Sequence, residues 1–389
     1  MNSLPLGWKL AKLGDVAEYI NGMAFKPIDW KTSGLPIIRI QNLTSIDAYF
    51  NYYQGDFDKK YLVENGDLLI SWSASLDAYI WRGDKAILNQ HIFKVVENNQ
   101  LITREYLYYA VRETMDEIRS QVHGATMKHI TRPEFLAIKI PLPSLEKQRR
   151  IASRLNEQLA AVESARKAAE EQLQAARQLP SAYLREIFTG NETTKWKIEK
   201  LGNLSTQITD GPHVTPKYKT EGIPFITVRN IVNRKIDLTN VSYISIEVHK
   251  EFCKRVKAEK GDILYTKDGT LGIPCVVNTD LDFSFFVSVA VIKLMRDKLN
   301  PFFVAYALES PQVLAQVEEL GAGMGLKHMV IKSIKALNIP VPSLEDQERI
   351  ANEIKSKLAE TARVTEMLES QLAEINRLPT SLLRKAFEG

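Results

Sequence analysis

Two long stretches of the chain place their apolar residues three or four positions apart, which is the spacing of one face of an α-helix. The first stretch runs from Leu145 to about Gln178. The second contains the apolar residues from Ile350 to Ile375 and extends to Pro379. Pro180 and Pro379 are expected to break or kink the helices near their ends. Each helix would hold roughly 33 residues, or about 50 Å at 1.5 Å per residue. The apolar stripes consist of Ile151, Leu155, Leu159, Val162, Ala165, Ala169, Leu173 and Ala176, and of Ile350, Ile354, Leu358, Thr361, Val364, Leu368, Leu372 and Ile375.

A helix of this length with one narrow apolar stripe and charged residues on its other faces needs a partner that covers the stripe. The chain supplies two such helices, so the pattern favours an antiparallel coiled coil formed within the chain. The alternative is a pair of ordinary surface helices, each packed on its own domain.

The rest of the chain alternates short apolar runs with polar loops, which is typical of strands. Two segments, 104–122 and 301–319, have helical spacing instead. This mixture predicts an α+β (mixed α/β) fold for both parts. The predicted strand runs are 35–40, 67–71 and 91–96 in the first half, and 224–228, 262–266 and 287–294 in the second.

The chain also repeats itself. The segment Trp8–Gly14 returns as Trp196–Gly202, and residues 124–152 match residues 323–351 at close to half of their positions. The middle of each copy diverges while its edges agree, which suggests one scaffold with two different working surfaces. We therefore expect an internal pseudo-two-fold repeat of globular domains and long helices. The expected boundaries are 1–143 and 191–342 for the domains, and 144–190 and 343–389 for the helices.

Composition narrows the class of protein. The chain has 51 Lys and Arg against 47 Asp and Glu, a net charge of +4, which excludes a polycation of the histone kind. Two cysteines make a disulfide framework unlikely and favour a reducing compartment. The first residues lack the apolar run of a signal peptide, and no apolar stretch approaches the length of a membrane span. The expected location is the cytoplasm.

The motifs of common active sites are missing from the sequence. There is no phosphate-binding Gly-x-x-x-x-Gly-Lys loop, no His-Glu-x-x-His helix and no Asn/Asp-Pro-Pro-Tyr/Phe motif of amino-methyltransferases. The six histidines do not fall at metal-ligand spacings. We therefore expect neither catalytic residues nor a metal site in this chain.

The polar residues in the loops favour recognition of DNA over catalysis. Asn, Gln, Arg and Lys are the side chains that read base edges or contact phosphates. The alternative is that the lysines are solvated, the histidines cap turns, and Trp72 is simply buried. The candidates in the first copy are Gln41, Asn42, Trp72, Ser73, Thr126, Lys128 and His129. Those in the second copy are Arg229, Asn230, Lys267, Asp268, Thr270, Lys327 and His328.

Each long helix starts with Pro-x-Pro-Ser-Leu-Glu-x-Gln-x-Arg-Ile-Ala, at residues 141–152 and again at 340–351. This motif, and the order of two domains and two helices over the whole chain, resemble the specificity (S) subunit of type I restriction–modification enzymes. The resemblance implies that the residues at the helix starts belong to the family's conserved structural region and bind partner subunits. Those residues are Glu146, Gln148, Arg150, Glu345, Gln347 and Arg349.

The resemblance also implies a division of labour between subunits. Each globular part would be a target recognition domain for one half of a bipartite DNA sequence, and the helix pair would space the domains. Two methyltransferase (M) subunits with S-adenosylmethionine, and restriction (R) subunits with ATP and Mg, would supply the chemistry. A helix pair of about 50 Å limits the half-site separation to roughly 15 base pairs. The alternatives are a structural coiled-coil adaptor for proteins only and an enzyme with fused catalysis.

Overall fold

The computed structural model describes residue 4 and residues 6–45, 47–72, 77–121, 131–321 and 328–388. The chain divides into two compact units. The first unit comprises Met1–Glu170 together with Ser370–Gly389, and the second comprises Glu171–Glu369. Each unit therefore contains one globular part and segments of the long helices.

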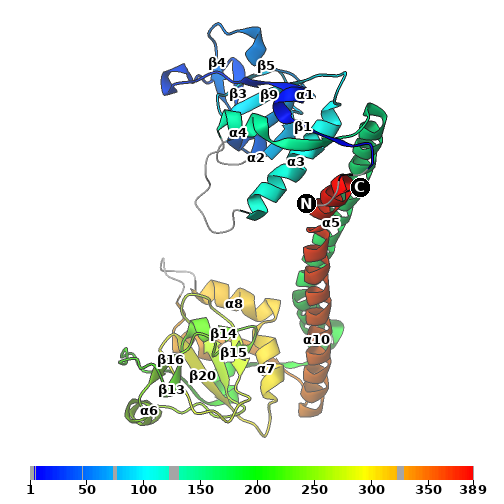
Figure 1. Cartoon of the computed structure of the whole chain (residues 1–389). Coiled ribbons are helices and arrows are strands. Elements are labelled where there is room, and N and C mark those ends of the chain that lie inside the picture. Colours follow the sequence, from blue (N-terminus) through cyan, green and yellow to red (C-terminus); the bar gives the residue numbers. More distant parts are fainter. Residues whose placement is uncertain are drawn as a thin grey trace. The chain divides into compact units, whose positions relative to one another are not determined.

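Two four-stranded sheets form the globular part of the first unit (Figure 1). One sheet has the order β2-β9-β6-β7 and is antiparallel, and the other has the order β4-β3-β8-β5, in which β3 and β8 are parallel. The helix α3 (Arg104–Gln121) packs against β7 and buries Tyr106 in the core. The strands are β2 (Ala17–Asn21), β3 (Leu35–Ile38), β4 (Asn51–Tyr53), β5 (Leu62–Val63), β6 (Leu68–Ser71), β7 (Asp77–Ile80), β8 (Ala86–Leu88) and β9 (Ile92–Glu97). Short helices are α1 (Leu13–Val16), α2 (Ile40–Thr44) and α4 (Arg132–Ala137).

The second unit repeats this plan. Its main sheet has the order β12-β20-β17-β18, and a smaller sheet has the order β16-β13-β19, in which β13 and β19 are parallel. The strands are β12 (Ser205–Asp210), β13 (Ile223–Ile226), β14 (Ile231–Val232), β15 (Lys235–Ile236), β16 (Ser242–Ile244), β17 (Ile263–Thr266), β18 (Pro274–Val276), β19 (Ser284–Phe285) and β20 (Val289–Leu294). The shorter helices are α6 (Ile246–Cys253), α7 (Pro301–Leu308), α8 (Pro311–Gly321) and α9 (Ile331–Ala336). The predicted mixed α+β class is confirmed, and every predicted strand run contains a strand.

A two-stranded ribbon leads from each globular part into a long helix. In the first unit β1 (Lys9–Lys12) pairs antiparallel with β10 (Lys139–Leu142). In the second unit β11 (Lys197–Lys200) pairs in the same way with β21 (Asn338–Val341). The repeated segments at the two edges of each copy are therefore joined in space, which explains why they agree while the middle diverges.

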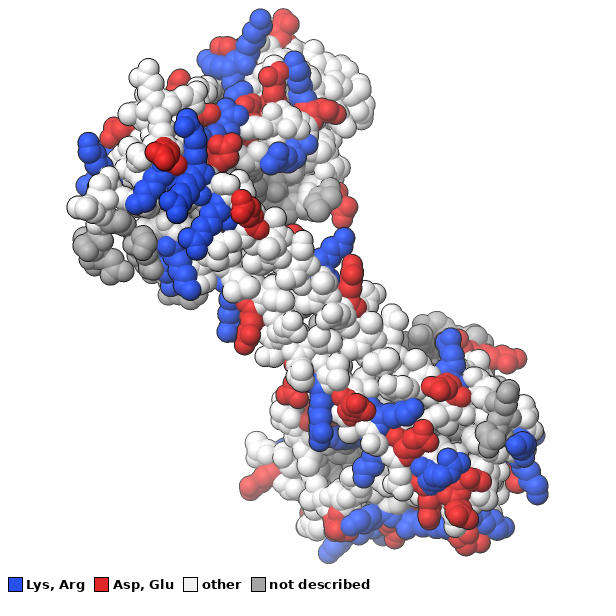
Figure 2. Space-filling view, turned by 90° about the vertical axis from the view of Figure 1, so that its right-hand side faces the viewer, with Lys and Arg blue, Asp and Glu red and all other residues white. Residues whose placement is uncertain are grey.

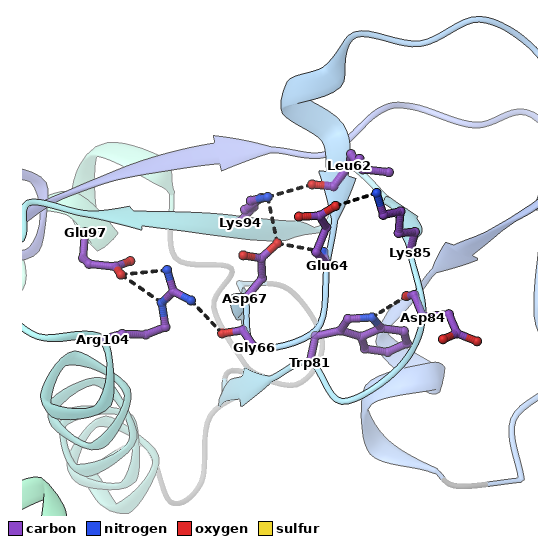
Figure 3. Close-up of polar contacts among 10 residues, drawn as sticks. All are labelled: Leu62, Glu64, Gly66, Asp67, Trp81, Asp84, Lys85, Lys94, Glu97 and Arg104. Atoms are coloured by element: carbon purple, nitrogen blue, oxygen red, sulfur yellow. Dashed lines mark hydrogen bonds and ion pairs between the residues drawn. The ribbon is translucent and has the colours of Figure 1, made fainter.

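The same charged turn precedes the central strand of the main sheet in both units, and Figure 3 shows it in the first unit. The Asp67 carboxylate accepts a hydrogen bond from the Glu64 N–H at 2.8 Å and pairs with Lys94 at 2.7 Å. Arg104 donates to the Gly66 carbonyl at 2.9 Å. Gly66 has a φ of +91°, a conformation that favours glycine.

In the second unit Asp262 takes the equivalent place. It accepts from the Glu259 N–H at 2.8 Å and pairs with Lys293 at 2.6 Å and Arg296 at 2.9 Å. Gly261, with a φ of +89°, precedes it. The repeated Gly-Asp pair is thus explained by folding, because it closes the turn that starts the central strand.

Three helices make up the long helical segments: α5 (Leu145–Thr189), α10 (Leu344–Ile375) and α11 (Leu378–Glu388). The break expected at Pro379 occurs between α10 and α11. At Pro180 the helix continues to Thr189 without a break. Leu184 and Phe188 beyond the proline are buried in the core of the second unit, and this burial offsets the lost backbone hydrogen bond.

The predicted helix over 301–319 is in fact two helices. The helix α7 ends at Leu308, and α8 begins at Pro311. Proline suits the first turn of a helix but cannot continue one, since it has no N–H to donate. Pro311 therefore starts a new helix.

Within the second unit, α5 and α10 are in contact. Arg177 pairs with Glu369 at 2.6 Å, and the Lys357 ammonium lies 4.9 Å from the centre of the Tyr183 ring. The stripe residue Leu173 is buried in the same unit. From Arg177 to Tyr183 the contacts advance along α5, whereas from Glu369 to Lys357 they go back along α10.

Residues near the C-terminal end of a helix complete each globular core. In the first unit Leu383 and Phe387 of α11 join the core, and the Phe387 ring lies 5.4 Å from that of Tyr106. In the second unit Phe188 of α5 lies 5.6 Å from Phe303. Ala152 and Leu155, at the start of α5, pack into the first core.

Candidate nucleic-acid interface

The first candidate pair in each copy follows β3 or β13, a strand of the sheet that contains a parallel pair, and sits on the same kind of turn. Asn42 accepts a hydrogen bond from the Arg39 N–H at 3.1 Å and donates to the Tyr49 carbonyl at 3.0 Å. Asn230 accepts from the Thr227 N–H at 3.0 Å and donates to the carbonyl seven residues later at 3.2 Å. Both amides are used inside the fold, so their side chains hold the turn.

The residue before each asparagine differs between the copies. Gln41 is half-buried, and its amide lies 3.5 Å from the Tyr49 carbonyl. Arg229 is exposed, and among the described residues its guanidinium has no hydrogen bond or ion pair. The same turn therefore presents an amide in one unit and a free cation in the other.

The end of the central strand carries Trp72 in the first unit. Its ring stacks on Phe93 with the centres 5.7 Å apart, and its indole N–H is buried without a partner among the described residues. Trp72 therefore contributes to the core as well as to the strand end. Ser73 lies outside the described residues.

The equivalent strand end of the second unit is charged. Lys267 is only 2% exposed, and its ammonium lies 3.5 Å from Asp210 and 3.6 Å from Asp268. His328 pairs with Asp268, and the N–H of Met329 donates to the Lys267 carbonyl at 2.8 Å. Candidates from two distant loops, at 267–268 and 328, are thus brought together. Thr270 is exposed nearby in the chain.

Other candidates lie outside the described residues: Thr126, Lys128, His129 and Lys327. Two side chains that sequence reasoning missed join the charged cluster. Arg255 pairs with Asp210 at 2.7 Å, and His213 lies 3.5 Å from the same carboxylate. No spacing in the sequence signals them, because β12 and the segment after α6 meet only in the folded unit.

A pocket of about 460 Å³ opens beside Arg229 in the second unit. Its lining residues include Tyr218, Phe286, Asn240 and Ser288. The Ser288 hydroxyl is buried and has no partner among the described residues. Apart from Arg229 and Asn230, none of these lining residues was identified from the sequence.

The glutamines at the helix starts have one geometry in both units. Gln148 accepts from the Thr103 N–H at 2.9 Å and donates to the carbonyls of Leu101 at 2.9 Å and Pro143 at 3.0 Å. Gln347 is bonded in the same way and is equally buried, at 0% exposure. Its partners are the Asn300 N–H at 2.9 Å and the carbonyls of Lys298 at 3.1 Å and Pro342 at 3.0 Å.

These two amides clamp the start of each helix to the globular part, so they have no surface to offer a partner. The charged residues of the same motif are exposed: Glu146, Arg150, Glu345 and Arg349.

Figure 2 shows that Lys and Arg gather over one side of the first unit on the face in view, whereas positive and negative side chains are interspersed on the second unit.

A family model described as the type I restriction modification DNA specificity domain matches residues 5–173 and 194–374. The two matches fall one in each copy of the repeat. The chain belongs to this family. Type I specificity subunits determine DNA target recognition and are not catalytic, since the enzymatic activity resides in partner subunits. The resemblance seen in the sequence, and the expectation of a non-catalytic protein, are thereby confirmed.

Known type I specificity subunits resemble the chain over most of its length. It is 26% identical to the specificity subunit of the Escherichia coli enzyme EcoBI, over 98% of this chain and 86% of that protein. It is 24% identical to the MjaVIII specificity subunit of Methanocaldococcus jannaschii, over 91% and 86%.

Two solved structures share the fold. A chain from a study of assembly and conformational transition in a type I R-M system has a TM-score of 0.76 and 22% identity, covering 100% of this chain and 99% of that one. The HsdS subunit of Thermoanaerobacter tengcongensis has a TM-score of 0.64 and 21% identity, covering 99% and 98%. In the described part of this specificity subunit, no helix combines the length and apolar character that a membrane crossing requires.

Proposed function

We propose that this specificity subunit reads a bipartite DNA target, with one half-site for each globular part. The observation that carries the proposal is the repeat itself. Both units share the order of the main sheet, the charged turn and the glutamine clamp, while the residues at the turn and the strand end differ. A common scaffold with different polar side chains is what two half-sites of different sequence require.

The proposal also assigns boundaries to the two domains and the two helices. Residues 1–143 and 191–342 form the two target recognition domains, and residues 144–190 and 343–389 form the helices between them. Candidate DNA contacts are the exposed or polar side chains at the turn and the strand end. They are Gln41, Trp72, Arg229, Lys267, Asp268, Thr270 and His328. The candidates outside the described residues stay part of the proposal: Ser73, Thr126, Lys128, His129 and Lys327.

The helices α5 and α10 act as an antiparallel coiled-coil spacer in this proposal. The contacts of Arg177 with Glu369 and of Lys357 with Tyr183 support it, because the residue numbers on the two helices run in opposite directions. At 1.5 Å per residue a helix the length of α10 spans about 50 Å, which corresponds to roughly 15 base pairs. The half-site centres would lie within that distance.

The complex supplies what this chain lacks. Two methyltransferase subunits with S-adenosylmethionine dock on the helix pair and the exposed charges at the helix starts, and restriction subunits use ATP and Mg. Because the relatives named above come from a bacterium and an archaeon, the proposal places the complex in the cytoplasm of a bacterial or archaeal cell. A net charge of only +4 fits a subunit that selects sequence while its partners provide much of the affinity.

The test is a binding selection with the specificity subunit and its methyltransferase partner on randomised duplex DNA. We expect enrichment of one bipartite sequence with a constant spacer. Binding without any bipartite preference would refute the proposal and favour a protein-only adaptor.

The spacer function has its own experiment. Shortening α5 and α10 by a matched number of residues should change the spacer and leave both half-sites intact. Gln172→Ala, an exposed substitution that keeps the length of α5, should change neither. A shortened variant with the wild-type spacer would contradict the role of the helices in setting the distance.

A further inference from the structure

The side chain that precedes the turn asparagine is the best-supported point at which the two recognition domains differ. Asn42 and Asn230 make equivalent hydrogen bonds, so the local backbone is set by the same side chain in both units. What varies is the neighbour, Gln41 in the first unit and Arg229 in the second. A matched turn with a changed side chain is suited to altering specificity without altering the fold.

The surroundings of Arg229 point to a ligand. The guanidinium has no partner among the described residues, although many exposed cations of the second unit are paired. It lines the pocket of about 460 Å³ together with Tyr218, which is 51% exposed, and Phe286. Among the residues that line this pocket, none is acidic.

A second, independent observation comes from another lining residue of the same pocket. Ser288 is only 7% exposed, yet its hydroxyl has no hydrogen-bond partner among the described residues. A buried hydroxyl without a partner costs free energy unless a ligand or water supplies one. The pocket thus combines aromatic residues, a free guanidinium and an unused hydroxyl, which suit the planar, polar edge of a nucleic-acid base.

We propose that Arg229 reads a guanine in the half-site of the second domain and that Gln41 reads an adenine at the equivalent place in the first. The guanidinium fork donates to the guanine O6 and N7 atoms, while a glutamine amide pairs with the adenine N6 and N7 atoms. The inference rests on the proposed function and adds which residue determines one base pair of each half-site.

The test uses the specificity subunit in complex with its methyltransferase partner and maps the methylated sequence by long-read sequencing. Arg229→Gln should change or relax one base pair of one half-site, with a loss of preference for guanine there of roughly 5- to 150-fold in competition binding. The other half-site and the spacer should stay unchanged. In the reciprocal variant, Gln41→Arg, one base pair of the opposite half-site should shift toward G·C.

Two controls keep the result interpretable. Lys250→Gln removes one exposed positive charge from α6, outside the pocket, and should leave the methylated sequence as it is. Arg229→Lys keeps the charge but lacks the planar fork, so it should also lose part of the guanine preference.

Three outcomes would overturn the inference. An unchanged sequence in Arg229→Gln would show that this residue reads no base. Equal weakening on every sequence would make Arg229 a phosphate contact. A wild-type complex without bipartite preference would instead remove the proposed function, and the inference with it.

Discussion

The glutamine clamp at the start of α5 makes a quantitative prediction about stability. Gln148→Ala removes three hydrogen bonds, one from the Thr103 N–H and two to the carbonyls of Leu101 and Pro143. Since each hydrogen bond contributes about 1 kcal/mol net, and the buried partner groups are left without a substitute, we expect a loss of ~3 kcal/mol. That is a large part of the stability of an ordinary domain.

Urea denaturation followed by tryptophan fluorescence measures this loss. Four tryptophans, Trp8, Trp30, Trp72 and Trp81, belong to the first unit, so the signal reports mainly on it. With a slope of roughly 2 kcal/mol per molar urea, the midpoint should fall by about 1.5 M.

The matched control is Gln172→Ala, which truncates an exposed glutamine of the same helix and should leave the midpoint within about 0.3 M of wild type. If Gln148→Ala also stays within that range, the clamp does not hold the first unit together. Gln347→Ala should weaken the second unit by a similar amount, because its amide makes the same three bonds.

Three further predictions concern single residues. Phe387→Ala should destabilise the first unit by about 3–5 kcal/mol, seen as a lower urea midpoint of the tryptophan signal, because the ring is buried in that core. Asp262→Asn should destabilise the second unit by about 3 kcal/mol in limited proteolysis, since it removes the buried carboxylate that pairs with Arg296 and, together with Glu259, with Lys293. Asp280→Asn, at an exposed ion pair, should change little. Burial raises the pKa of Glu309 above its ordinary value of 4.5, although Arg234 opposes the shift. The folded unit therefore keeps this proton to a higher pH than the unfolded chain, so stability falls as the pH rises from about 4.5 through the raised pKa. Glu309→Gln should remove that part of the denaturation pH profile, and an unchanged profile would contradict the assignment.

Local patterns were sufficient for the scaffold. The short apolar runs that became β6 and β17 were visible because strands buried on both faces are apolar throughout, and the long stripes of α5 and α10 were visible because apolar residues recur every three or four positions. Pro311 was visible too, and its preference for the first turn of a helix should have divided the predicted helix over 301–319.

The candidate site was less accessible from the sequence. Asn230 looked like a base-reading residue, yet its amide caps a turn, a use that the Thr-x-x-Asn spacing at 227–230 already suggested. The pocket beside Arg229 could not have been seen, because Tyr218 and Ser288 meet only after β13 pairs with the distant strand β19. Such sites depend on long-range pairing, whereas periodicity reports only on neighbours.

The packing of α11 on the first globular part has a consequence for synthesis on the ribosome. Leu383 and Phe387, which complete the first core, are translated after the whole second globular part. The first globular part therefore emerges before the second but is completed after it, since its core stays incomplete until residues 383 and 387 have been made. The second core can close earlier, because its last buried residues, Ile350, Ala351 and Ile354, precede Leu383 in the chain.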